Sequence, residues 1–174
     1  MFPREWRDSP INAGAESLAS RETERSLRAV RLAFTKYPPS LLRSNLDRVY
    51  LIRQLRFSGI SAAGTNSLDR VYVSVESVEQ GYSDAFIEST FHHEFSSILL
   101  RNFPHLFAKS EWFSVNPAGF RYKESGTDAI KAGKASEDYA PELAKKGFLT
   151  EYAMWDFEDD FNTIATALFM GNPD

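Results

Sequence analysis

Six consecutive residues, His92-His93-Glu94-Phe95-Ser96-Ser97, bring together the side chains of this chain that are best suited to chemistry. When the pattern His-Glu-x-x-His lies on a helix, its two histidines hold one zinc ion and its glutamate takes a proton from zinc-bound water. Here His93 and Glu94 occupy the first two positions, but Ser97 stands where the second histidine belongs. The segment therefore predicts a metal-binding helix in which one ligand is replaced.

The second metal ligand is the open question at this helix. A serine hydroxyl such as that of Ser97 is a poor zinc ligand beside an imidazole. His92 could substitute, but neighbouring helical residues point about 100° apart, so both histidines would reach one ion only with local distortion. The other interpretation of His92 is a partner for Glu88 or Ser96, one turn away. His105 could approach from the loop beyond the helix.

The composition is that of an ordinary globular protein. The 174 residues, 43% of them hydrophobic, are enough for one domain with a substantial core. A net charge of −4 gives no reason to expect nucleic-acid binding. No apolar run approaches the ~20 residues of a transmembrane helix. The absence of cysteine leaves histidine, carboxylates and water as the metal ligands.

Hydrophobic spacing predicts the elements that position these residues. Apolar residues at helical spacing predict helices, and β-branched runs predict strands. The predicted helices span 22–37, 85–102 and 157–170, and the predicted strands span 49–57 and 70–75. Residues 62–66 are predicted as a loop of small residues. Residues 108–146 are predicted as a long irregular stretch, and a loop of this length in a compact domain more often has a function than none. The pattern indicates an α+β fold, with a small sheet packed against helices that include the His-Glu helix.

Both ends of the chain differ from its middle. Residues 1–21 are polar and contain Pro3, Pro10 and Gly14, which is typical of a flexible leader or linker. Residues 171–174 form a turn signal directly after a helix pattern, and such a signal usually introduces another element. We therefore expect a domain over residues 22–174. If the terminal turn introduces another element, this domain is truncated at its C-terminal end.

A second group of candidate residues follows the irregular stretch. The segment from Gly147 to Ala153 includes Tyr152 and leads into a helix that opens Phe157-Glu158-Asp159-Asp160-Phe161-Asn162. Acidic residues at a helix N-terminus match the helix dipole, and carboxylates are also zinc ligands. Glu158 lies about 60° from Phe161 around the helix and Asp159 about 160°, so helical geometry favours Glu158 on the buried side.

These segments, in this order, resemble the zinc-binding metallopeptidases of bacteria, a gluzincin-like family of the zincins with two histidines and a glutamate as ligands. The resemblance covers roughly residues 48–170 and departs from the family at Ser97. It implies a zincin-like fold, a Zn²⁺ cofactor, a peptide or protein substrate and an exported or cell-envelope location. Glu94 matches the general base, Tyr152 a tyrosine that stabilises the oxyanion, and His93 the first ligand.

Two points stay open at the level of sequence. Anchoring the resemblance on Asp160-Phe161 makes Asp159 the acidic ligand, whereas helical geometry favours Glu158. The predicted function is a zinc-dependent metallopeptidase that hydrolyses peptide bonds. Its alternative is a catalytically inactive zincin-like binding or structural module, which has lost tight zinc binding because Ser97 replaces the second histidine.

Overall fold

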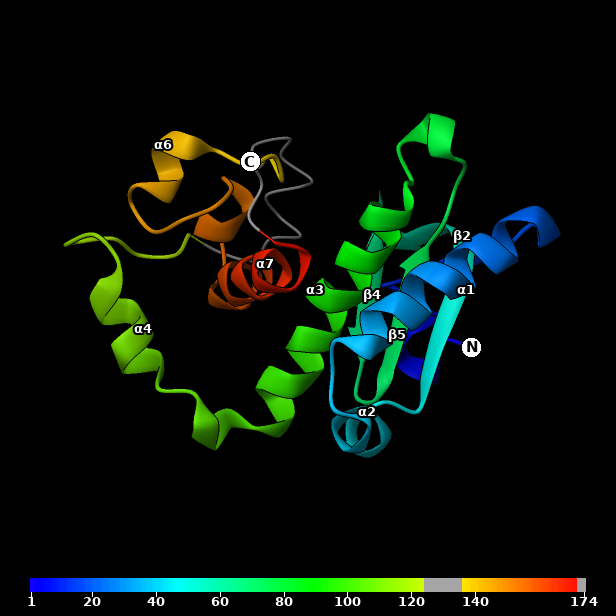
Figure 1. The fold of residues 1–174 in the computed structure, drawn as a ribbon, viewed down its shortest axis with the longest axis horizontal. Helices are drawn as coiled ribbons and strands as arrows, with labels where there is room; N and C mark the ends of the chain where they lie inside the picture. The colour runs from blue at the N-terminus through cyan, green and yellow to red at the C-terminus, as the bar shows by residue number, and fades with distance from the viewer. Residues whose placement is uncertain (124–135, 172–174) are drawn as a thin grey trace. The chain divides into compact units, whose positions relative to one another are not determined.

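A computed structural model describes residues 1–123 and 136–171 (Figure 1). The chain divides into two compact units, Met1–Ile98 and Leu99–Asp174, where the sequence predicted one domain over residues 22–174. The first unit combines helices with a small mixed sheet, so the predicted α+β class is confirmed. None of the helices in the described residues is long and apolar enough to cross a membrane.

The sheet belongs to the first unit and has the strand order β1-β2-β5-β4, with β3 paired to β2 outside that path. The strands are β1 (Gly14–Ser17), β2 (Arg48–Phe57), β3 (Ile60–Ser61), β4 (Gly64–Ser67) and β5 (Arg70–Ser74). β2 and β5 are parallel, with Arg48 opposite Arg70 and Ile52 opposite Ser74, and the other pairs are antiparallel. The sequence predicted β2 and β5, the two strands rich in β-branched and aromatic residues.

Three α-helices accompany this sheet (Figure 1). They are α1 (Ser20–Thr35), α2 (Pro39–Asn45) and α3 (Asp84–Asn102), so the predicted helices at 22–37 and 85–102 are confirmed. The Phe86 N–H donates to Ser83 Oγ at 3.1 Å, and this bond caps the start of α3. Four residues of α3 at helical spacing have no exposed surface: Ile87, Phe91, Phe95 and Ile98. This stripe places Phe91 and Phe95 in the core of the first unit.

Two segments of the first unit differ from the prediction. Residues 1–21 were predicted as a leader or linker, but they contribute β1, and Phe2 stacks on Tyr72 with ring centroids 5.1 Å apart. Residues 62–66 were predicted as a loop, but β4 begins at Gly64. Both strands have only four residues. Backbone pairing with a neighbouring strand defines them, and their own side chains have weak strand propensity.

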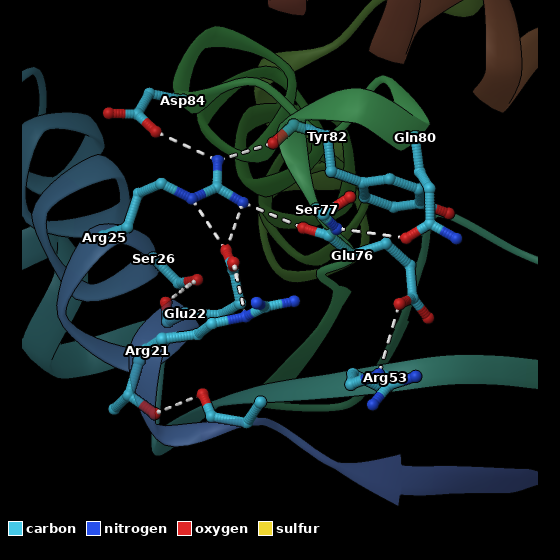
Figure 2. A network of polar contacts seen from close by, with 12 residues as sticks. Arg21, Glu22, Arg25, Ser26, Arg53, Glu76, Ser77, Gln80, Tyr82 and Asp84 are labelled. Atoms are coloured by element: carbon cyan, nitrogen blue, oxygen red, sulfur yellow. Dashed lines mark hydrogen bonds and ion pairs between the residues drawn. The ribbon is translucent and has the colours of Figure 1, made fainter.

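Arg25 connects α1 to the segment that leads into α3 (Figure 2). Its guanidinium donates to the carbonyl oxygens of Tyr82 at 2.5 Å and Glu76 at 2.9 Å. It also forms ion pairs with Glu22 at 2.7 Å and Asp84 at 3.1 Å. The start of α3 is therefore attached to α1 by one side chain with several charge-assisted bonds.

The second unit contains short helices and one long one among its described residues. They are η3 (Pro104–Leu106), α4 (Lys109–Val115), α6 (Pro141–Ala144), η4 (Tyr152–Met154) and α7 (Phe157–Met170). α7 confirms the predicted helix at 157–170, and Asp156 caps it by accepting from the Glu158 N–H at 2.7 Å. α4 and α6 lie in the stretch predicted as irregular. Residues 124–135 of that stretch, and residues 172–174 of the predicted terminal turn, lie outside the described residues.

Candidate functional site

Glu94 of α3 has its carboxylate directly against the edge strand β4. Asn66 Nδ2 donates to Glu94 Oε2 at 2.6 Å. A Cβ added to Gly64 would lie 2.8 Å from Glu94 Oε1 and 2.7 Å from Thr90 Cγ2, so the glycine leaves the space that the carboxylate fills. Glu94 is 9% exposed. The predicted general base is therefore a largely buried carboxylate with a fixed hydrogen-bond donor.

His93, the predicted first zinc ligand, precedes Glu94 on the same helix. Burial lowers the pKa of His93 to about 4, from an ordinary value of 6.5. The imidazole is therefore neutral at neutral pH, and the neutral form is the one that binds metal ions. The structure thus gives α3 a neutral imidazole and a buried carboxylate on adjacent residues.

His92 belongs to a buried polar cluster in the first unit. Its Nδ1 lies 2.8 Å from the Tyr37 hydroxyl, and its Nε2 lies 3.6 Å from Glu88 Oε1. Lys36 Nζ lies 2.7 Å from the same Glu88 oxygen. Burial, together with the Lys36 charge, lowers the pKa of His92 to about 4, and Glu88 acts in the opposite direction. The approach to Glu88, one turn away, is the one that the second interpretation of His92 predicts.

The serines of the motif are both buried, and Ser97 is 2% exposed. Ser96 Oγ donates to the His93 carbonyl oxygen at 2.7 Å, within its own helix. Within either unit, the described residues hold no group of three or more His, Asp or Glu side chains that could bind a metal ion. A catalytic zinc site uses three protein ligands, so the residues of the first unit alone do not fit zinc.

The remaining predicted site residues belong to the second unit. Tyr152 begins η4, and Glu158 and Asp159 lie in the first turn of α7. The Glu158 side chain is 41% exposed, and its Oε1 lies 3.4 Å from Arg101 Nη1. Glu158 therefore lies at the surface of its unit, in an ion pair.

Asp160 is the buried carboxylate of the acidic cluster, and the sequence did not single it out. It is 1% exposed, and its Oδ2 accepts from the Tyr122 hydroxyl at 2.6 Å and from Trp112 Nε1 at 2.9 Å. Burial raises the pKa of Asp160, and the two hydrogen bonds oppose that rise. Burial and the bond to Asp160 raise the pKa of Tyr122 to about 12. Trp112 and Tyr122 belong to the stretch predicted as irregular, and each has an N–H or O–H that needs an acceptor when it is buried. That need was the sign in the sequence that a buried carboxylate such as Asp160 is present.

Asn66 and Gly64 were also missed, because both fell in a segment predicted as a loop. A small residue and an amide two positions apart on a strand lie on one face, but this relation is visible only once the strand is assigned. No protein-family model, no curated protein and no solved structure matches the chain. The function is therefore inferred from the chemistry of these side chains.

Proposed function

We propose that this protein is a zinc-dependent peptide hydrolase with His93 as a metal ligand and Glu94 as the general base. The observation that supports the proposal is the pairing of a neutral imidazole with a buried carboxylate on consecutive residues of α3. The carboxylate accepts a hydrogen bond from the edge strand β4. A general base needs a fixed position next to the proton that it removes, and this hydrogen bond provides one.

The ligands beyond His93 come from the sequence resemblance. In it, Glu158 or Asp159 matches the carboxylate ligand and Tyr152 the tyrosine that stabilises the oxyanion, while Ser97 is a weak further donor. Zinc, when bound, would supply a water molecule that loses its proton near neutral pH, and Glu94 has the chemistry of the general base for that proton.

The zinc content of the purified protein tests the first step. We expect bound zinc in the parent protein, a loss of most of it in His93→Ala, and no loss in the control Glu142→Ala, at a carboxylate whose side chain is 82% exposed. Zinc is measured by elemental mass spectrometry after dialysis. A parent protein without zinc above the buffer background contradicts the proposal.

The role of Glu94 is tested separately from metal binding. Glu94→Gln should retain zinc but lose peptide hydrolysis about 100-fold or more, because the amide cannot accept the proton. Hydrolysis is followed with a fluorogenic peptide library. Activity that persists in Glu94→Gln would remove Glu94 as the base.

A second candidate function is a non-catalytic module that binds peptides without cleaving them. The observation that favours it is Ser97, a weak donor at the position of the second histidine. This module would bind members of the same peptide library without zinc and leave them intact. Peptide cleavage that depends on zinc excludes it.

A further inference from the structure

We propose that residues 104–119 form a strap, which opens from α7 as one piece and then gives solvent access to the buried carboxylate of Asp160. The strap contains η3 and α4 and ends at Gly119, which has a φ of 81°. A glycine with positive φ tolerates backbone rotation that other residues resist, so this end of the strap is suited to a hinge. Opening of the strap is independent of whether the protein binds zinc or hydrolyses peptides.

Few side chains attach the strap to α7. Phe107, Trp112 and Asn116 are partly buried, and the other residues of the strap are exposed. The Trp112 ring centroid lies 5.9 Å from that of Phe161 and 6.1 Å from that of Phe157. The Phe107 ring lies 5.0 Å from Phe161 in an edge-to-face contact. Two aromatic side chains therefore provide most of the apolar attachment.

Trp112 also provides the polar attachment to α7. Its Nε1 donates to Asp160 Oδ2 at 2.9 Å. The other carboxylate oxygen, Asp160 Oδ1, is buried and has no hydrogen-bond partner among the described residues. A buried carboxylate oxygen without a donor is unfavourable, and water can supply that donor once the strap opens. The Trp112 contacts therefore hold the strap closed, while the solvation of Oδ1 favours the open form.

The backbone hydrogen bonds of the strap are local. The Trp112 N–H donates to the Ala108 carbonyl oxygen at 3.1 Å, within one helical turn. The Leu106 N–H donates to the Phe103 carbonyl oxygen at 3.0 Å. α4 has seven residues and no side-chain bond at its N-cap, and a helix of this length depends on its packing. Opening thus requires the loss of the side-chain contacts with α7 and leaves the rest of the unit folded.

Hydrogen exchange of the backbone amides tests the opening. In the parent protein, the helical amides of α4 should exchange about 100-fold or more faster than those in the middle of α7. Low concentrations of urea should leave the α4 rate unchanged, because opening exposes little surface compared with unfolding. This comparison needs no variant. Exchange in α4 as slow as in α7 would overturn the inference.

Trp112→Phe tests the attachment itself, since phenylalanine keeps an aromatic ring but lacks the N–H that donates to Asp160. We expect exchange in α4 to become about tenfold faster, while exchange in α7 stays within about twofold. Trp6→Phe, the same substitution in the first unit, should leave α4 unchanged. Equal acceleration in α4 and α7 would mean that Trp112 stabilises the whole unit, and no separate strap would exist.

Carboxyl labelling tests whether the opening exposes Asp160. A water-soluble carbodiimide couples glycine ethyl ester to accessible carboxylates with loss of water, and peptide mass spectrometry identifies the labelled residues. The labelling rate of Asp160 should rise about tenfold in Trp112→Phe, in parallel with the exchange of α4. Glu142, whose side chain is 82% exposed, should be labelled at the same rate in both proteins. If α4 exchanges faster but Asp160 is labelled no faster, the strap does not cover this carboxylate and the inference is wrong.

Discussion

At the scale of single residues, Gly64 shows how little freedom the candidate base has. The carboxylate of Glu94 lies where a side chain on residue 64 would have to be, and Thr90 occupies the rest of that space. A close-packed position of this kind resists even one added methyl group, because neither neighbour can move without losing its own contacts.

Gly64→Ala should therefore lower the free energy of unfolding by about 1–3 kcal/mol. The new Cβ would lie 2.7 Å from Thr90 Cγ2, so the strand or the helix must shift. Urea unfolding followed by circular dichroism measures the change. Gly14→Ala in β1 is the matched control, because the nearest atom to its Cβ is 4.0 Å away. Equal stabilities of the two variants would contradict the close packing at Gly64.

Tyr122 makes the corresponding contribution in the second unit. Tyr122→Phe removes the hydroxyl that donates to the buried carboxylate of Asp160 at 2.6 Å. We expect a loss of about 1–3 kcal/mol, the typical cost of removing a hydrogen bond to a buried charged group. Tyr139→Phe, at a tyrosine that is 44% exposed, should change stability by less than about 0.5 kcal/mol. Chemical denaturation of both variants decides the point, and similar small effects would mean that Asp160 does not depend on Tyr122.

At the scale of elements, Arg25 determines how α3 begins. Its side chain is 14% exposed and joins α1 to the backbone at Glu76 and Tyr82, just before the helix that contains the candidate site. Glu76 also accepts from Arg53 Nε of β2 at 3.2 Å (Figure 2). Arg25 belongs to α1, Arg53 to β2, and Glu76 to the segment before α3. Their hydrogen bonds therefore attach the start of α3 both to α1 and to the sheet.

Arg25→Ala should cost about 2 kcal/mol of unfolding free energy, because two backbone carbonyls lose a charged donor. Hydrogen exchange of the backbone amides between residues 76 and 84 should become faster, since this segment loses its attachment to α1. Arg21→Ala is the control one turn earlier, where the side chain is 80% exposed. Unchanged exchange between residues 76 and 84 in Arg25→Ala would show that the segment is held by other contacts.

Sequence reasoning found the elements whose signals are local. The apolar spacing of α3 and the β-branched run of β5 are visible within one window, and both predictions are confirmed. β1 and β4 were missed, because four polar or small residues become strands only through a partner distant in sequence. The same limit applies to the site: the motif indicated His93 and Glu94, but the contact from Asn66 spans 28 positions.

At the scale of the whole molecule, buried histidines make stability depend on pH. The folded state holds the pKa of His92 at about 4, below the ordinary 6.5. Between these values the unfolded chain binds the proton and the folded state does not, so protonation favours unfolding. The contribution of the neutral His92 to the free energy of unfolding is therefore fully present above about pH 6.5, and it is lost as the pH falls toward 4.

The free energy of unfolding of the metal-free protein should thus decrease from pH 7 to pH 4, and His92→Gln should make that decrease shallower. The slope is compared by urea titrations at several pH values, so a constant loss of stability in the variant does not affect the result. His105→Gln, at an exposed histidine, should leave the slope as in the parent protein. An unchanged slope in His92→Gln would mean that folding does not lower the pKa of His92.

The pairing of β1 with β2 also bears on solubility. β1 pairs with β2 between Ile52 and Arg56, along the edge of β2 that is opposite to β5. A shortened protein that begins at Ser20 would lose this cover and present part of β2 as an open strand edge. An uncovered edge with apolar residues is a template for pairing between molecules, so trimming the polar N-terminal segment should promote aggregation.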